Sequence, residues 1–187
     1  MVATCDLRLA ATGLVVVLAL GGCSGEQNAP SAAPVSPSVA TPTMSSTPTP
    51  SPATAQERAA VDAVLAYIRV VDKLGIDPTS DIDELNTVAT GDALAQMQYI
   101  LLNYRKDGWH QVGEQVPTFV SSTPGSTASE WAISMCVDVS AVDVLDADGN
   151  SVKNPDSEPR LLVDYDTVES AAAGQWYVQR DKAVDSC

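Results

Sequence analysis

The sequence predicts an α+β domain in which three N-terminal helices pack on a curved antiparallel sheet of about four strands. Two observations lead to this fold class. Apolar residues recur with the helical period of 3.6 between residues 55 and 106, and then with a period of two between residues 111 and 180. Helices that precede a run of strands, instead of alternating with them, are typical of an α+β domain. Residues 55–187 are long enough to fold as one such unit around its own core.

The first helix is expected to begin at Thr54. Thr54 and Glu57 have the spacing of a capping box, in which each side chain satisfies a backbone N–H of the first turn. Gly75 is expected to end this helix, because glycine tolerates the left-handed conformation of a helix C-cap. Its apolar stripe contains Ala60, Val61, Val64, Leu65, Ile68, Val71 and Leu74.

Two further helices are expected before the strands. Ser80 is placed to cap a short second helix that directs Ile82, Leu85 and Val88 inward. The third helix runs from about residue 91 to 106 and ends at Gly108. Its inward stripe contains Leu94, Met97, Leu101 and Tyr104. The acidic residues of the first two helices, which we expect to be exposed charges that favour solubility, are Asp62, Asp72, Asp81, Asp83 and Glu84.

The predicted strands follow from alternation. Residues 111–122 form a first strand with apolar positions at Val112, Val116 and Val120. Residues 127–145 give the clearest strand, and its phase slips near Ala141, which predicts a β-bulge. Its apolar face contains Trp131, Ile133, Met135, Val137 and Val139. Residues 160–168 and 175–180 complete the sheet.

The N-terminal segment has the pattern of an export signal. An apolar run of about 12 residues, 9–20, is too short for a permanent membrane span, which needs about 20. The four residues Leu20-Gly21-Gly22-Cys23 that follow resemble a bacterial lipobox. This resemblance implies a signal peptide over residues 1–22, cleavage between Gly22 and Cys23, and a lipid on the Cys23 sulfur. An ordinary secretory signal with an incidental cysteine is the alternative.

Residues 23–54 are expected to be a lipidated cysteine followed by a disordered tether. The segment is rich in Pro, Ser and Thr and has few large apolar residues, so it cannot bury enough surface to offset the entropy of ordering. Two or more acyl chains hold a protein stably on a bilayer. The predicted location is therefore the extracytoplasmic face of the cell membrane, with the lipid anchor at Cys23 as the contact.

Five segments of residues 55–187 carry a family resemblance. They are Val71-Asp72-Lys73-Leu74, residues 88–94, residues 136–140, Asp146-Ala147-Asp148-Gly149 and Trp176-Tyr177-Val178. With them the domain resembles small actinobacterial lipoproteins that have an NTF2-like fold. The resemblance implies a cone in which a curved sheet wraps around helices. These segments are structural, and none carries a catalytic signature.

The cysteines predict one disulfide. Cys5 is removed with the signal peptide and Cys23 is the lipid site, which leaves Cys136 and Cys187 in an oxidising compartment. A bridge to Cys136 would fix the last residue of the chain, which otherwise frays. Two unpaired thiols are the alternative.

Charge and composition exclude several functions. With 24 acidic against 10 basic residues and a net charge of −14, the chain lacks the basic surface that nucleic-acid binding requires. His110 is the only histidine, which excludes a multi-histidine metal site. The Asp146-x-Asp148-Gly149 pattern is not an EF-hand, because Val144 and Pro155 occupy positions that need oxygen ligands. We therefore expect no cofactor and no metal site, and a hairpin turn at residues 146–149. A weak calcium contact through several of Asp143, Asp146, Asp148 and Asp156 stays open.

We expect a non-enzymatic lipoprotein whose domain binds a protein partner or a small apolar ligand. The inner face of the sheet is continuous and apolar, with Asp138 on the opposite face. One alternative is a hydrolase or isomerase with its site inside the cone, which would require a deep cavity with a buried aspartate beside a tyrosine. Another is a cell-envelope assembly or exclusion factor of a mobile element. If the domain is an enzyme, the first candidates for an ionisable site residue are Asp143 and Asp164 at the mouth of the cone. Further possible pocket residues are Tyr67, Tyr99, Tyr104, Asp107 and His110.

Overall fold

The computed structural model describes residues 50–171 and 174–187. The predicted signal peptide, the lipobox and most of the tether therefore lie outside the described residues. The elements are the α-helices α1 (Ala55–Ile76) and α2 (Gly91–Asp107), the 3-10 helix η1 (Ile82–Thr87), and the strands β1 (His110–Val112), β2 (Val116–Pro124), β3 (Glu130–Asp138), β4 (Asp143–Leu145), β5 (Arg160–Glu169) and β6 (Trp176–Ser186). The α+β fold class, with three helices on a four-stranded antiparallel sheet, is confirmed.

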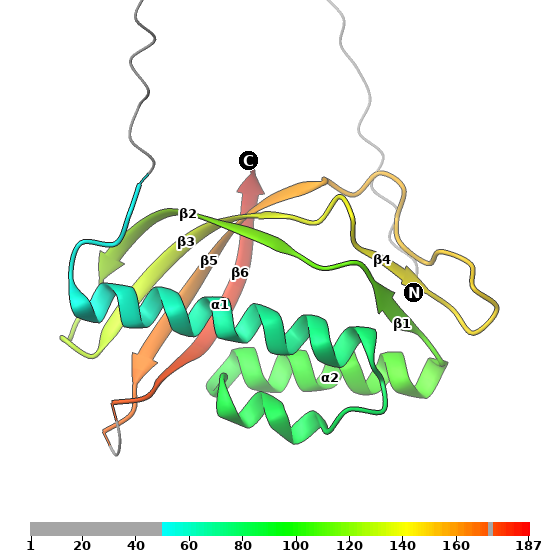
Figure 1. Cartoon of the computed structure of the whole chain (residues 1–187), viewed down its shortest axis with the longest axis horizontal. Coiled ribbons are helices and arrows are strands. Elements are labelled where there is room, and N and C mark those ends of the chain that lie inside the picture. The colour runs from blue at the N-terminus through cyan, green and yellow to red at the C-terminus, as the bar shows by residue number, and fades with distance from the viewer. Residues whose placement is uncertain (1–49, 172–173) are drawn as a thin grey trace, which may run out of the picture. The chain divides into compact units, whose positions relative to one another are not determined.

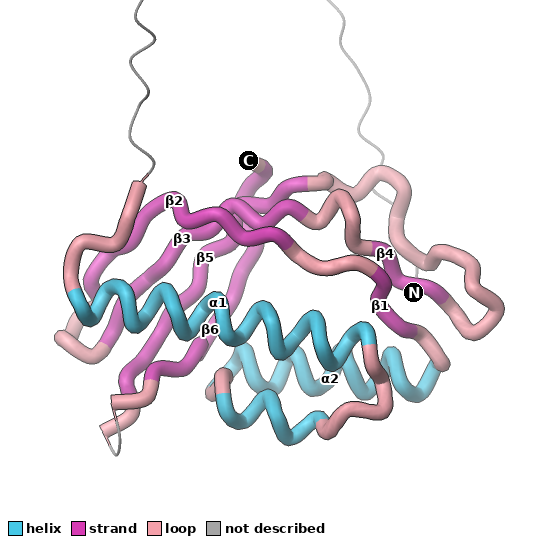
Figure 2. The backbone as a smooth tube through the Cα atoms, viewed as in Figure 1, coloured by secondary structure: helices cyan, strands magenta, loops and turns pink. Residues whose placement is uncertain are grey.

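The main sheet has the strand order β2-β3-β5-β6, and every neighbouring pair is antiparallel. Figure 1 shows α1 lying across this sheet, where it contacts β3, β5 and β6. Helix α2 packs mainly against β6. Strands β1 and β4 form a separate two-stranded sheet next to the end of α1, as the tube in Figure 2 shows.

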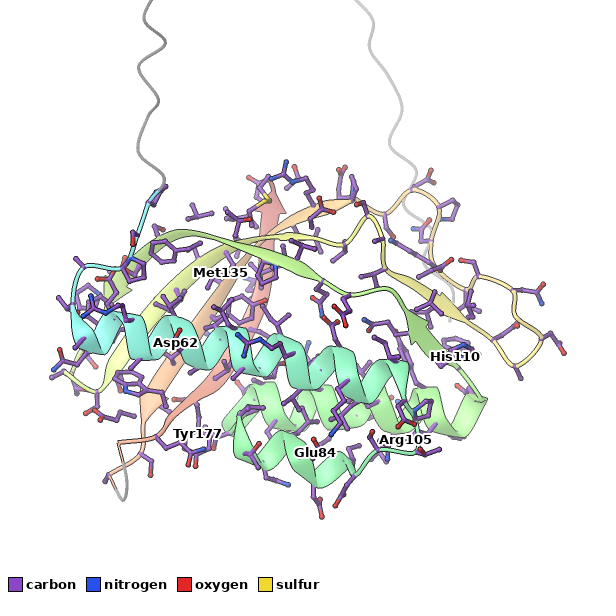
Figure 3. All side chains as sticks on the ribbon, in the orientation of Figure 1. Asp62, Glu84, Arg105, His110, Met135 and Tyr177 are labelled. Carbon is purple, nitrogen blue, oxygen red and sulfur yellow. A yellow bond between two sulfur atoms is a disulfide. The ribbon has the colours of Figure 1, made fainter. Side chains whose placement is uncertain are left out.

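The core lies between α1 and the inner face of the main sheet. Ile133, Met135 and Val137 of β3 are almost completely buried there, together with Val64 of α1. Figure 3 shows Met135 between the sheet and α1. Burying a side chain of this size contributes about 1.5–3 kcal/mol. The alternation predicted for β3 is confirmed, because Trp131 and Val139 also pack against this core.

The start of α1 is as predicted, but its end is not. Thr54 and Glu57 form the capping box: the Thr54 hydroxyl accepts a hydrogen bond from the backbone N–H of Glu57, and the Glu57 carboxylate accepts one from the backbone N–H of Thr54. The helix does not end at Gly75; it continues to Ile76, and Asp77 is its C-cap. Gly75 serves close packing instead, because a Cβ atom there would lie 2.8 Å from Oε1 of Gln111.

The second helix also begins differently from the prediction. Asp81, not Ser80, is the N-cap of η1, and its carboxylate accepts a hydrogen bond from the N–H of Asp83. Leu85 and Val88 are buried as expected. Helix α2 ends at Gly108, whose φ of 72° confirms the predicted glycine C-cap.

The predicted strand over residues 111–122 is in fact two strands, β1 and β2. Gly113 separates them with a φ of 76°, and a Cβ atom there would lie 2.0 Å from the carbonyl oxygen of Ala141. The predicted apolar phase is wrong as well: Val116 is 61% exposed and Val120 is exposed, whereas Phe119 packs against the core. The break at Gly113 accounts for the changed phase, because β2 begins anew with Pro117 and Phe119 as its half-buried positions. The register shift between Phe119 and Ser121 comes only after these residues.

The predicted long strand over residues 127–145 divides too. β3 ends at Asp138, and β4 pairs with β1 in the second sheet. The slip near Ala141 is therefore a turn between two sheets and not a bulge. The Lys153 ammonium holds this turn, because it donates hydrogen bonds to the carbonyl oxygens of Val139 at 3.1 Å and Val142 at 2.7 Å.

The disulfide between Cys136 and Cys187 is confirmed, with a Cα–Cα distance of 5.9 Å. It joins β3 to the residue after β6, and these two strands are not neighbours, since each pairs with β5. The Nη2 atom of Arg160 in β5 lies 3.2 Å from Sγ of Cys136. The bridge therefore passes over β5 and holds the C-terminus against the sheet.

Candidate functional site

The candidate site is an open groove beside the C-terminal half of α1. One wall is α1, and the other is formed by Glu114 and Gln115 of the β1–β2 connection and Pro117 of β2. The groove has a volume of about 650 Å³, which lies within the range of ligand sites. Its apolar lining consists of Leu65, Ile68, Ile76 and Pro117, and its polar lining of Arg69, Asp72, Lys73, Asp77, Ser80, Glu114 and Gln115.

Asp72 connects the two walls. Its Oδ1 accepts hydrogen bonds from the side-chain amides of Gln111 at 2.7 Å and Gln115 at 3.0 Å. Its Oδ2 accepts one from the backbone N–H of Gln115 at 3.0 Å. The prediction that Asp72 is an exposed charge is wrong, because the residue is only 6% exposed. Three N–H donors offset the cost of taking this carboxylate out of water.

Gln111 extends this connection. Its side-chain amide also donates to the carbonyl oxygen of Gly113 at 3.0 Å, so one side chain joins α1 to the start of the β1–β2 connection. Close packing of Gln111 against Gly75 fixes the same side chain from the helix side. We call Asp72, Gln111 and Gln115 the polar clamp. The clamp holds the two walls of the groove at a fixed separation.

The charged groups around the groove differ in how they are paired. The Lys73 ammonium donates to both carboxylate oxygens of Glu84, at 2.6 and 2.7 Å. Asp77 accepts hydrogen bonds from the hydroxyl and N–H of Thr79 and from the hydroxyl of Ser80. These bonds, led by the Thr79 hydroxyl, hold the pKa of Asp77 below its usual value, so it is ionised at neutral pH. Arg69 and Glu114 are exposed.

A second polar feature lies in the interior, under α1. The Tyr67 hydroxyl donates to Oδ2 of Asp181 at 3.0 Å, and the Tyr165 ring meets the Tyr67 ring edge-on at a centroid distance of 6.3 Å. Oδ1 of Asp181 is buried with no hydrogen-bond partner among the described residues. Burial raises the pKa of Asp181 and raises those of Tyr67 and Tyr165 well above the usual value for tyrosine.

This pair changes one expectation about the inner face. Tyr165 of β5 lies between Asp181 of β6 on one side and the fully buried Ile133 of β3 on the other. An ionisable residue on β6 therefore does interrupt the apolar inner face of the sheet. The pair supplies the aspartate–tyrosine contact expected of an enzyme. The groove, however, is lined by other residues, and the side chains around the pair are packed core.

The structure places the remaining pocket candidates apart from this pair. Tyr99 is 70% exposed on α2, and Tyr104 packs against Trp109 at a ring-centroid distance of 5.9 Å. Asp107 is the exposed last residue of α2, and His110 is half-buried in β1, where it pairs with Leu145. Asp164, suggested for the mouth of the cone, accepts a hydrogen bond from Ser134, which alternates onto the outer face of β3.

Two carboxylates of the acidic loop around residues 143–150, those of Asp143 and Asp146, accept hydrogen bonds from within the loop. Asp146 accepts hydrogen bonds from the backbone of Asp148 and Asn150, and the Asn150 backbone bond is the main reason for its lowered pKa. Asp143 accepts one from the Ser151 hydroxyl at 2.7 Å. Within residues 50–171 and 174–187, His, Cys, Asp and Glu side chains form no group of three or more suited to hold a metal ion.

Residues 50–171 and 174–187 also contain no helix with both the length and the apolar composition of a membrane span. The groove was not predicted from the sequence. Its only signals were Asp72, which looked like one more exposed helical charge, and two glutamines four residues apart.

Comparisons with known proteins define the fold and not a family. The domain belongs to the class of α+β domains in which helices cover one face of a four-stranded antiparallel sheet. No protein-family model matches the chain. No curated protein matches it either. Among solved structures it is similar to the intermembrane space region of the chloroplast protein ARC6, at 13% identity and a TM-score of 0.56, over 69% of this chain and 96% of that one. At this identity the likeness concerns the fold alone.

Proposed function

We propose that this protein is a membrane-anchored, extracytoplasmic lipoprotein whose NTF2-like domain is a non-enzymatic binding module. The groove beside α1 is the binding site, and it takes a segment of a partner protein or a small apolar ligand. One observation carries the proposal: a groove of about 650 Å³ with four apolar lining residues is held open by a buried polar clamp. A site that is formed before its ligand arrives loses less entropy on binding.

Two further features support this function. The disulfide between Cys136 and Cys187 fits an oxidising compartment outside the cytoplasm. The sheet curves around α1, and the interior between them is filled by apolar side chains, as an NTF2-like cone with a packed interior requires. The exposed apolar side chain of Ile76, 39% exposed in the groove, is the kind of surface that marks a binding site when it adjoins other apolar residues.

The anchor is tested by Cys23→Ala. The variant should lose its lipid and leave the membrane fraction, because Cys23 is the predicted attachment site. Membrane fractionation after metabolic labelling with a fatty acid measures both effects. Cys5→Ala is the matched control and should stay lipidated and membrane-bound. A Cys23→Ala protein that still carries lipid would show that the lipobox assignment is wrong.

The groove is tested with Nile red, an uncharged dye that fluoresces when it enters an apolar site. The full chain carrying Cys23→Ser, to prevent lipidation, should bind the dye, and Ile76→Ser should weaken binding severalfold by removing apolar lining. Val152→Ser is the matched control, since Val152 is 38% exposed but does not line the groove. Equal binding by the two variants would exclude the groove as the apolar site.

A hydrolase or isomerase remains the second candidate because of the hydrogen bond between Tyr67 and Asp181. Such an enzyme must admit a substrate to the interior. Small-molecule fragments should then shift the NMR signals of Tyr67 and Asp181, and Tyr67→Phe should abolish the shift. Fragments that shift only Ile76 and its neighbours in the groove would favour the binding module.

A further inference from the structure

The charge of the groove indicates what kind of partner it accepts. Asp72, Asp77 and Glu114 contribute three carboxylates to its lining. Lys73 and Arg69 contribute two cations, but Lys73 is already paired with Glu84. The three lining carboxylates, together with Glu84 beside Lys73, therefore outnumber the two basic groups, on a chain whose net charge is −14. The potential around the groove is negative, which attracts a basic occupant.

The apolar part of the groove requires that the occupant also has an apolar face. Ile76 of α1 and Pro117 of the opposite wall are both lining residues, and Leu65 and Ile68 continue the apolar surface along α1. A ligand that carried charge alone would leave these side chains in contact with water.

Addition of a strand from the partner to β2 is disfavoured. β2 is an edge strand of the main sheet, but it contains Pro117 and Pro124, which have no N–H to donate, and a register shift interrupts it after Phe119. Proline and bulges on an edge strand are devices that block pairing with another chain. The partner must then be recognised through side-chain contacts instead of backbone pairing. Binding of an amphipathic helix in a groove is the recognition mode that depends on such contacts.

We infer that the groove binds a basic amphipathic helix of a partner protein, with its apolar face against Ile76, Leu65 and Pro117 and its lysine or arginine side chains toward Glu114 and Asp77. This inference rests on the proposed function, because it names the occupant of the same groove. The apolar contacts supply most of the affinity, and the carboxylates set the selectivity for a basic helix over an acidic one.

The test uses two designed, fluorescently labelled helical peptides of about 18 residues, long enough to form a helix on binding. One carries leucine at helical spacing with lysine at the other positions, and the other carries leucine with glutamate. Fluorescence anisotropy measures their affinity for the full chain carrying Cys23→Ser. The leucine–lysine peptide should bind, and the leucine–glutamate peptide should bind at least about tenfold more weakly, a difference typical of charge selectivity at an interface.

Two pairs of variants separate groove binding from general attraction to an acidic protein. Glu114→Lys should weaken binding of the leucine–lysine peptide about tenfold, whereas Asp148→Lys, which makes the same change of charge on the exposed loop, should change it by about twofold or less. Ile76→Ser and Val152→Ser form the corresponding apolar pair. Thermal unfolding checks that each variant folds, and Glu114→Gln replaces Glu114→Lys if the latter does not.

Each result decides the inference. Equal losses for Glu114→Lys and Asp148→Lys, or equal affinity for the two peptides, would overturn it. If the peptides fail to bind while Nile red still binds and Ile76→Ser weakens it, the inference fails and the proposed function stands. If neither the dye nor the peptides depend on Ile76, both fail.

Discussion

One carboxylate in the packed interior under α1, Asp181, and one at the groove beside it, Asp72, are held in opposite ways. Asp181 in the interior accepts one hydrogen bond, from Tyr67, and its other oxygen is buried without a partner among the described residues. Asp72 at the groove accepts three hydrogen bonds from Gln111 and Gln115. The interior is thus stabilised mainly by apolar packing, whereas the groove is stabilised by a polar network.

This difference explains how one helix can cover a filled core and also form one wall of a hollow. Where α1 faces β3, β5 and β6, buried side chains such as Val64 and Met135 fill the space. Where α1 faces Glu114–Pro117, the polar clamp fixes the separation of the walls, so apolar side chains are not needed to hold them together. Substitutions in the two regions should therefore fail in different ways.

The largest expected effect lies outside both regions, at the disulfide. Cys136→Ser should lower the free energy of unfolding by about 4 kcal/mol, because the bridge closes a loop with a sequence separation of 51 residues. Cys187→Ser should cost the same, and the double variant no more than either one. Urea unfolding measures all three. Additive losses in the double variant would mean that the two cysteines act separately.

A smaller effect is expected in the packed interior. Met135→Ala should lower the free energy of unfolding by about 3 kcal/mol, since Met135 is completely buried and its removal leaves a cavity. Leu65→Ala, on the groove side of α1, should cost less than about 1 kcal/mol, because Leu65 is only half-buried and faces an existing hollow. Equal costs in urea unfolding would contradict the distinction between core and groove.

The polar clamp should show a smaller and more local effect. Asp72→Asn should cost about 1–2 kcal/mol, because an asparagine cannot accept all three N–H donors with one oxygen. Hydrogen exchange at the backbone N–H of Gln115 should speed up more than exchange in β3. Asp62→Asn is the matched control on an exposed face of α1, labelled in Figure 3, and should change stability by less than about 0.5 kcal/mol. Unchanged exchange at Gln115 would argue against the clamp.

The smallest effect concerns the pH dependence at Asp181. Burial raises the pKa of Asp181 above its usual value of 3.8, so its contribution to stability is present at lower pH and is lost as the pH rises through its folded pKa. Asp181→Asn removes this ionisation. The variant should therefore gain stability relative to the wild type as the pH rises above 4. Solvent around this partly exposed group keeps the change small. A constant difference between the two proteins from pH 4 to 7 would refute it.

Sequence patterns predicted the parts of the fold that depend on local periodicity. The capping box at Thr54 and Glu57, the alternation of Ile133, Met135 and Val137, and the Gly108 C-cap are all determined by residues within a few positions. The pairing of Cys136 with Cys187 was also predictable, because only these two cysteines were left after Cys5 was assigned to the predicted signal peptide and Cys23 to the predicted lipid site.

The groove depends on contacts between distant segments, so no local pattern revealed it. Asp72 accepts a hydrogen bond from Gln115, which lies 43 residues later in the sequence. The sequence alone cannot distinguish an aspartate with such a distant partner from one that is exposed to water. Val116 looked like a core residue because valine favours strands, but Gly113 interrupts the predicted strand, and β2 begins anew with Pro117 and Phe119 as its half-buried positions. The Tyr67–Asp181 contact was missed because β6 continues past residue 180, where its predicted strand ended.

If a tether holds the domain, as proposed, the disulfide has a mechanical consequence. Covalent closure between Cys136 and Cys187 means that tension applied at the N-terminus cannot lengthen the segment that contains β5 and β6. Only the part before Cys136 can be drawn out, beginning with α1, whose N-terminal end receives the load first. The groove, formed by α1 and Glu114–Pro117, lies in this extensible part. Under the proposed function, a pulling force would therefore open the groove and release its occupant while β5 and β6 stay covalently enclosed.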